Sequence, residues 1–170
     1  MEKEFLDLIE PIISKESYQS MKNYRHHGNT STYDHSISVA YLCYKYHKKH
    51  NSKIDLKSLI RGALLHDYYL YDWHHTKEGH RFHGLRHPKT SLKNAKRDYG
   101  PLNKIEIDII IHHMFPLVIL PPLTKAGWIV SYYDKVATKN DYKKKKEKLA
   151  NDKTPTPPPP PPAPPRPPPP

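Results

Sequence analysis

A histidine, a His-Asp pair and a distant aspartate follow one another along this chain at His35, His66-Asp67 and Asp134. Imidazole nitrogens and carboxylate oxygens hold borderline or hard divalent cations, and four such ligands leave coordination positions open for water and a substrate. A cation held in this way lowers the pKa of a coordinated water toward about 7 and polarises a phosphoryl oxygen. The set therefore indicates hydrolysis at a metal ion, with His66 and Asp67 as the catalytic pair.

Taken singly, the members of this set have ordinary structural explanations. His35 alone would more often be a hydrogen-bonded packing residue. Asp134 alone could be a surface carboxylate paired with Lys135 or Lys139. The ordered set is much harder to mimic, because several independent coincidences would have to occur together. We therefore predict that its four residues are metal ligands.

The segments that carry these residues have helical patterns. A polar loop over residues 28–32 can cap a helix that places His35 in its first turn. Asp55 is a candidate cap for the next helix, in which apolar residues recur at helical spacing: Leu56, Leu59, Ile60, Ala63 and Leu64. Adjacent helical residues point about 100° apart, so the helix end at His66-Asp67 supplies the freedom for both to reach one ion.

Further helical segments flank the first two. A packing helix is expected over residues 5–13, with Pro11 bending or ending it. Pro88 just inside a start and Gly100 just past an end bracket another helix, with His87 at its amino terminus.

The last two predicted helices lie closer to the carboxyl end. Asn103 and Glu106 form a capping-box pattern at the start of a helix that runs to His112-His113. A final helix is expected over about residues 124–136, where Asp134 stands among aromatic and aliphatic neighbours. A buried carboxylate there needs a cation or hydrogen bonds to remain charged.

The ordered set resembles the core pattern of the HD superfamily of metal-dependent phosphohydrolases, which have a His, a His-Asp and a distant Asp on an all-helical scaffold. The segments that carry the resemblance lie within residues 24–139 and are YDHSISVAYL, RGALLHD, HGLRHP, IIIHHMFP and IVSYYDK. The resemblance implies an all-α fold with a single compact HD-type domain. It also implies phosphoester hydrolysis with a divalent ion, for which Zn, Mn, Fe, Mg and Ni are candidates.

Some members of that superfamily hold a second ion with histidines between the His-Asp pair and the last aspartate. His87 and His113 fall in matching places, so the resemblance implies one or two metal ions per chain. Other histidines offer the same chemistry: His74, His75, His80, His83 and His112. Which residue of the His112-His113 pair points inward stays open.

The sequence departs from two well-marked subgroups. Tyr68, Tyr69 and Leu70 follow Asp67, so the Gly-Lys continuation of cyclic-dinucleotide-cleaving members is absent. The acidic residue that some nucleotidase members carry three places on is absent too. Asp72 is the nearest downstream carboxylate, and it is either a base or proton donor or a plain surface residue.

A small phosphorylated substrate is expected, with a nucleotide as one candidate. Arg25 and His27, together with His26, supply groups that bind phosphate oxygens, although an ordinary basic loop has the same composition. A formal net charge of +11 favours an anionic ligand. Four aromatic residues could stack on a nucleobase or pack in the core: Tyr68, Tyr69, Tyr71 and Trp73.

The composition divides the chain into a folding part and a tail. Residues 1–150 have the size of one domain, whereas residues 151–170 are rich in proline and are expected to be disordered with polyproline II character. The tail could dock on a polyproline-binding partner or be merely solvated. Cys43 is the only cysteine, which fits a reducing compartment, and no apolar run approaches the roughly 18 residues of a membrane helix. We therefore expect a cytoplasmic protein with no membrane association.

Two other function classes compete with an enzyme. A non-catalytic HD-like module could keep the metal for structure, or could sense a nucleotide, while its tail recruits a partner. An RNA-binding protein driven by basic charge would need a recognised motif, which is absent, so no specific nucleic acid is expected. The intact ligand set favours catalysis, because ligands that leave open coordination positions are what a metal hydrolase needs.

Overall fold

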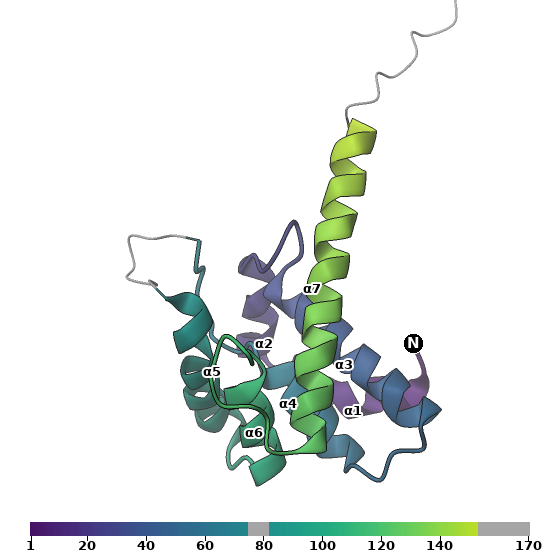
Figure 1. Ribbon diagram of the computed structural model, residues 1–170, viewed down its shortest axis with the longest axis vertical. Coiled ribbons are helices and arrows are strands. Elements are labelled where there is room, and N and C mark those ends of the chain that lie inside the picture. The colour runs from purple at the N-terminus through teal and green to yellow at the C-terminus, as the bar shows by residue number, and fades with distance from the viewer. Residues whose placement is uncertain (75–81, 153–170) are drawn as a thin grey trace, which may run out of the picture.

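Every regular element in the described part of the molecule is a helix. The computed structural model describes residues 1–74 and 82–152, with side chains up to residue 143, and its only β-type pairing there is a bridge between Arg25 and Ser31. The elements in chain order are α1 (Lys3–Ile13), α2 (Glu16–Gln19), the 3-10 helix η1 (Ser20–Asn23), α3 (Thr32–Lys49), α4 (Leu56–Leu65), α5 (His83–Tyr99), α6 (Lys104–His112) and α7 (Lys125–Asp152). The predicted all-α fold is confirmed (Figure 1).

Some predictions fall outside the described residues. The proline-rich tail lies there from residue 153 onward, as do His75 and His80. Within the described part, no helix is both long enough and apolar enough to cross a bilayer.

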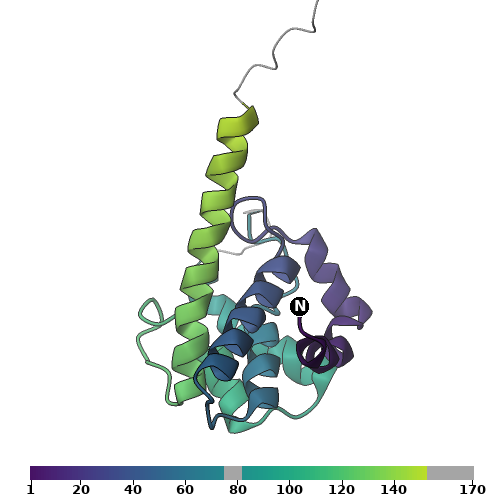
Figure 2. The same cartoon turned by 90° about the vertical axis from the view of Figure 1, so that its right-hand side faces the viewer.

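Helix α4 is at the centre of the bundle. It packs against α1, α3 and α6, while α7 lies across α3 and α6 (Figures 1 and 2). Seven of its ten residues are buried: Ser58, Leu59, Ile60, Gly62, Ala63, Leu64 and Leu65. A helix with so wide a buried face must be covered by several others. The central position fixes the place of His66 and Asp67, which follow directly on its last turn.

The close approach of α4 and α6 depends on a glycine. A Cβ atom at Gly62 would lie 2.5 Å from Ile109 Cδ1, well inside van der Waals contact. The absence of a side chain therefore lets the two helices approach closely. Since both helices end on the same side of the bundle, His66 and His113 lie next to each other, with ring centroids 4.9 Å apart.

The predicted caps are present at three helix starts. The Ser31 hydroxyl accepts from the Asp34 amide at the start of α3. The Asp55 carboxylate accepts from the Ser58 amide at 2.9 Å at the start of α4. A reciprocal capping box joins Asn103 and Glu106 at the start of α6. Each cap satisfies a backbone donor that a helix leaves without an intrahelical partner.

Helix α1 ends at Ile13, as predicted, and it continues through Pro11, because proline removes only one bond, to an exposed carbonyl. Two predicted boundaries are wrong. Helix α5 begins at His83 instead of Pro88, so His87 stands in its second turn, and Pro88 costs only the bond to the Gly84 carbonyl. Helix α7 runs to Asp152, well beyond the predicted 136, and its last turns extend past the bundle (Figures 1 and 2).

An unpredicted carboxylate joins α6 to the start of α7. Asp108 accepts bonds from the Leu123 amide at 2.9 Å, the Thr124 amide at 2.9 Å and the Thr124 hydroxyl at 2.6 Å. Its other contact is with His112 Nδ1 at 2.7 Å. Burial would raise the pKa of Asp108, but these donors lower it. The carboxylate therefore acts as the cap that sets the direction in which α7 leaves the preceding loop.

Replacing this carboxylate should destabilise the fold. We expect Asp108→Ala to lower the free energy of unfolding by about 1–3 kcal/mol, because the amides at the start of α7 lose their acceptor. Urea unfolding measures this difference. Asp7→Ala, at an exposed position of α1, is the control and should change the free energy of unfolding by less than about 0.5 kcal/mol. Equal effects of the two substitutions would contradict the capping role.

Candidate metal centre

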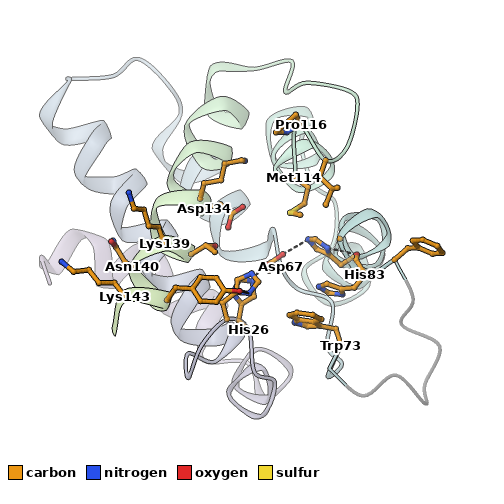
Figure 3. A pocket seen from close by; sticks show the side chains of 18 residues that line it. His26, Asp67, Trp73, His83, Met114, Pro116, Asp134, Lys139, Asn140 and Lys143 are labelled. Carbon is orange, nitrogen blue, oxygen red and sulfur yellow. Dashed lines mark hydrogen bonds and ion pairs between the residues drawn. The ribbon is translucent and has the colours of Figure 1, made fainter. Parts of the chain in front are cut away.

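All six predicted metal ligands meet in one buried cluster. The ligands come from the first turn of α3, the end of α4, the second turn of α5, the end of α6 and the middle of α7. Every one of them is at most 7% exposed: His35, His66, Asp67, His87, His113 and Asp134. Residues far apart in the sequence therefore form one group at the floor of a cavity (Figure 3).

The Asp67 carboxylate lies at the middle of the cluster. Its Oδ1 atom is 3.0 Å from His87 Nε2 and 3.4 Å from His113 Nε2. Its Oδ2 atom is 3.5 Å from His66 Nε2 and 2.8 Å from His26 Nε2. The two oxygens therefore face two different sets of imidazoles.

Backbone carbonyls fix the orientation of three of the imidazoles. The Nδ1 atoms of His66, His87 and His113 bond to the carbonyls of Ala63, His83 and Ile110 at 2.6, 3.0 and 2.9 Å. A carbonyl can only accept, so the Nδ1 atoms carry the protons and the Nε2 atoms present lone pairs to the cluster. The Ala63 and Ile110 carbonyls lie in the last turns of α4 and α6, where helices leave carbonyls without intrahelical partners.

A carboxylate fixes the fourth imidazole. His35 Nδ1 is 3.1 Å from Asp141 Oδ2, and His35 Nε2 is 3.1 Å from Asp134 Oδ1. A carboxylate–imidazole pair of this kind holds a metal-binding histidine in one tautomer and raises its basicity. His35 can therefore direct Nε2 at an ion that Asp134 shares.

The cluster fits a cation. His87 Nε2 and His113 Nε2 are 2.8 Å apart, and two lone pairs at that distance repel unless a proton or a metal separates them. His66 Nε2 and Asp67 Oδ1 are buried and accept no hydrogen bond from the described residues. His35, His66 and Asp134 each offer a ligand atom within 4.8 Å of the other two, and so do His66, Asp67 and His113. Such unsatisfied acceptors are what a divalent ion would satisfy.

The charges of the cluster also favour a cation. Burial would raise the pKa of Asp67, but His66 and His87 keep it well below its usual range. Burial would likewise raise the pKa of Asp134, and the bond from His35 lowers it. Burial lowers the pKa of His66 to about 4, so that ring is neutral at pH 7. Two ionised carboxylates thus face a neutral imidazole in a buried space.

Two imidazoles of the cluster have raised pKa values. Burial would lower the pKa of His87, but the charge of Asp67 raises it. His35 carries a proton while no metal is bound. Burial alone would lower its pKa, but the hydrogen bonds to Asp134 and Asp141 raise it to about 9. A metal at His35 Nε2 must displace that proton, because a ligand nitrogen has to be unprotonated.

His26 also belongs to the cluster. The sequence instead suggests a phosphate-binding role for it, beside Arg25 and His27. It is 5% exposed, its Nε2 lies 2.8 Å from Asp67 Oδ2, and burial together with the charge of His35 lowers its pKa to about 3. His26 also forms a potential ion-binding group with His35 and Asp67. However, its Nδ1 is buried without a partner, and orphaned buried N–H groups are rarer than orphaned acceptors. The proton therefore belongs on Nε2, which donates to Asp67.

Asp141 is a functional residue that the sequence prediction missed. It is 3% exposed and bonds to His35. Its spacing of seven from Asp134 places both carboxylates on one face of a helix, and this feature could have identified it. No comparable pattern singles out His26.

The predicted substrate-binding residues divide between cavity and surface. His27 lines the cavity, and its Nδ1 is 3.2 Å from the Tyr142 hydroxyl. Arg25 is exposed and is not among the residues that line the cavity. Asp72 does not line it either, and its carboxylate bonds to the amide and ring of His74. The proposal that Arg25 binds substrate therefore gains no support from its position.

The ambiguity at His112-His113 is resolved. His113 enters the cluster, whereas His112 bonds to Asp108.

The aromatic residues after Asp67 lie in two different environments. Tyr68 and Tyr69 are fully buried in the core, as a packing role requires, whereas Trp73 lines the cavity with its ring nearly parallel to that of His83.

A cavity of about 1320 Å³ opens over the cluster. His26, Asp67, His87 and Asp134 lie on its lining, so a ligand in the cavity can reach the candidate metal centre (Figure 3). The cavity is larger than inorganic phosphate requires and leaves room for an organic ligand.

Comparison with known proteins gives one match. The family model described as HD domain matches residues 32–139, which is more than half of the chain. All six predicted ligands lie inside the matched region, whereas His26 and Asp141 lie outside it. No curated protein and no solved structure matches the chain.

The geometry predicts two ions per chain, one at His35, His66 and Asp134 and a second at Asp67, His87 and His113. Metal analysis of the purified protein should give about two equivalents, and the His87→Ala/His113→Ala double variant should retain about one, because the set around Asp67 Oδ1 is lost. His47→Ala removes a half-buried histidine of α3 outside the cluster and should leave the content at two. A double variant that still binds two equivalents would show that these histidines are not ligands.

The protonation of His35 predicts a pH dependence for the metal-free protein. Its folded pKa of about 9 is above the ordinary value of 6.5, so its contribution to stability is complete below pH 6.5 and is lost as the pH rises to about 9. The melting temperature of chelated protein should therefore fall over this range. Metal-loaded protein should not show the fall, because the metal takes the place of the proton. Identical pH profiles with and without metal would count against this assignment.

Proposed function

Because this chain belongs to the HD domain family, a superfamily of metal-dependent phosphohydrolases, we propose that it hydrolyses a phosphoester of a small organic substrate. A nucleotide is one candidate for that substrate. The observation that carries the proposal is the convergence of four imidazole Nε2 atoms on the Asp67 and Asp134 carboxylates at the floor of an open cavity. A divalent metal ion held there supplies a Lewis acid that lowers the pKa of a coordinated water and polarises a phosphoryl oxygen.

The protein's own residues have distinct tasks in this proposal. His35, His66 and Asp134 would hold one ion, and Asp67 with His87 and His113 would hold a second. Bonds from Nδ1 keep the imidazoles in the binding tautomer, so little reorganisation is needed when an ion enters.

Two further residues act on the ligands and the substrate. The Nε2–H of His26 orients the Asp67 carboxylate. The ring of His27, on the cavity wall, would contact a phosphoryl oxygen. Arrangements that keep ligands in the reactive geometry before substrate arrives are a main source of rate enhancement.

The test is metal-dependent turnover of a phosphoester panel. We expect hydrolysis by the metal-loaded protein, loss after chelation and recovery on adding the metal back. His66→Ala/Asp67→Ala should lower kcat by at least about 1000-fold, since metal activation is worth several kcal/mol of the barrier. Asp72→Ala is the matched control. It removes a carboxylate from the segment between α4 and α5, which also carries Asp67, but Asp72 does not line the cavity, so turnover should be retained.

The other outcomes separate the remaining hypotheses. Bound metal with no turnover of any phosphoester would favour the non-catalytic module that senses a nucleotide or acts as a scaffold. An absence of bound metal would remove the basis of the proposal. A polyproline-binding partner for residues 151–170 is a separate proposal, and a pull-down with and without that segment would test it.

A further inference from the structure

The two sides of the cavity differ in chemistry. The α7 side presents Lys135, Lys139, Asn140 and Lys143. The opposite side presents apolar groups from the segment after α6, next to His83 of α5 (Figure 3). His26, Asp67 and Asp134 lie between the two sides (Figure 3). A ligand whose phosphoryl group reaches the cluster would therefore contact a cationic surface on one side and an apolar surface on the other.

Two of the lysines on the α7 side have different tasks. The Lys135 ammonium donates to the Ser131 carbonyl at 2.9 Å, the Ser131 hydroxyl at 2.8 Å and the His113 carbonyl at 3.2 Å. These bonds use all three of its protons, so Lys135 ties the end of α6 to α7. The Lys139 ammonium, one turn further on, is exposed and has no hydrogen-bond or ion-pair partner among the described residues. Lys139 is therefore available for a ligand anion.

The position of Lys139 sets where that anion must lie. Lys139 lies five positions after Asp134, which corresponds to about 7.5 Å along the helix axis. A ligand that contacts both the cluster and this lysine therefore extends along α7. A negative group of such a ligand, apart from its phosphoryl group, would meet the Lys139 ammonium.

The opposite side has an apolar wall next to the imidazoles of His83 and His87. Met114, Pro116 and Leu117 line the cavity, and Leu117 is 53% exposed. A Cβ atom at Gly84 would lie 2.7 Å from Leu117 Cδ2, so the start of α5 and the segment after α6 are in direct contact. Exposed apolar groups in a cavity gain stability when an apolar part of a ligand covers them.

We propose that the natural substrate is an organic phosphoester whose leaving group has an apolar or aromatic body and carries a second negative charge, bound by Lys139. The apolar body would cover Met114 and Leu117 while the phosphoryl group reaches the cluster. Inorganic phosphate and polar sugar phosphates would leave this wall in contact with water. The inference rests on the proposed function for the identity of the reacting group, but it concerns binding and can be measured without turnover.

Non-hydrolysable phosphonates test the role of Lys139. Calorimetric titration of the metal-loaded full-length chain compares phenylphosphonate with 4-carboxyphenylphosphonate, which differ only by the second anion. We expect the carboxylated ligand to bind about fivefold more tightly, the effect of an ion pair of about 1 kcal/mol at a partly exposed site. In Lys139→Gln this ratio should fall to about one. In Lys125→Gln, at the other end of α7 and outside this cavity, it should stay near five.

A second pair of ligands tests the apolar wall. Phenylphosphonate should bind at least about tenfold more tightly than methylphosphonate, because the ring buries apolar surface. Leu117→Ser should lower this ratio at least about threefold, and because Leu117 is half exposed the fold should tolerate the change. Equal binding of the methyl and phenyl ligands, or a carboxylate preference that survives in Lys139→Gln, would overturn the inference.

The binding data and the turnover data separate this inference from the proposed function. The expected binding ratios without hydrolysis of any phosphoester would support the ligand class and overturn the enzymatic function. Hydrolysis of phosphoesters with no preference in either ligand pair would support the enzyme and overturn the ligand class.

Discussion

The interaction on which the rest of this structure depends is the contact of one buried carboxylate with several imidazole nitrogens. Asp67 receives a hydrogen bond from His26, and its other neighbours present lone pairs to it. A buried anion surrounded by acceptors is unfavourable unless a cation or protons lie between them. The cluster is therefore arranged for a positive charge, and the charge distribution around it is incomplete without one.

The scaffold produces this arrangement through its helix ends. Helices α4 and α6 terminate next to each other, because Gly62 allows them to approach closely. Their last turns offer carbonyls that need donors, and the histidine just past each helix end supplies one through Nδ1. The same bond that completes the helix end also directs Nε2 into the cluster. The hydrogen bonds from these two Nδ1 atoms therefore both stabilise the helix ends and orient the candidate ligands.

Helix α7 connects the cluster to the cavity above it. Its Asp134 and Asp141 hold His35 from both sides, and Lys135 ties the helix to the end of α6. The Asp108 cap sets the direction of the helix at its first residues. One turn beyond Lys135, Lys139 is left for a ligand. A single helix therefore carries one candidate metal ligand, orients another and presents a cationic side chain to the cavity.

The sequence by itself determined the helical fold and its caps, and it identified the set from His35 to Asp134, because periodicity, capping and ligand type are local properties of the chain. It could not decide between His112 and His113, and it did not identify Asp141 or the bond from His26 to Asp67. It also predicted the start of α5 and the end of α7 wrongly, since tertiary packing extends helices beyond their local propensity. Only the tertiary structure decided these points. The role of a histidine or a lysine depends on which carbonyl, carboxylate or open space its ring or ammonium meets, and those partners come from other helices.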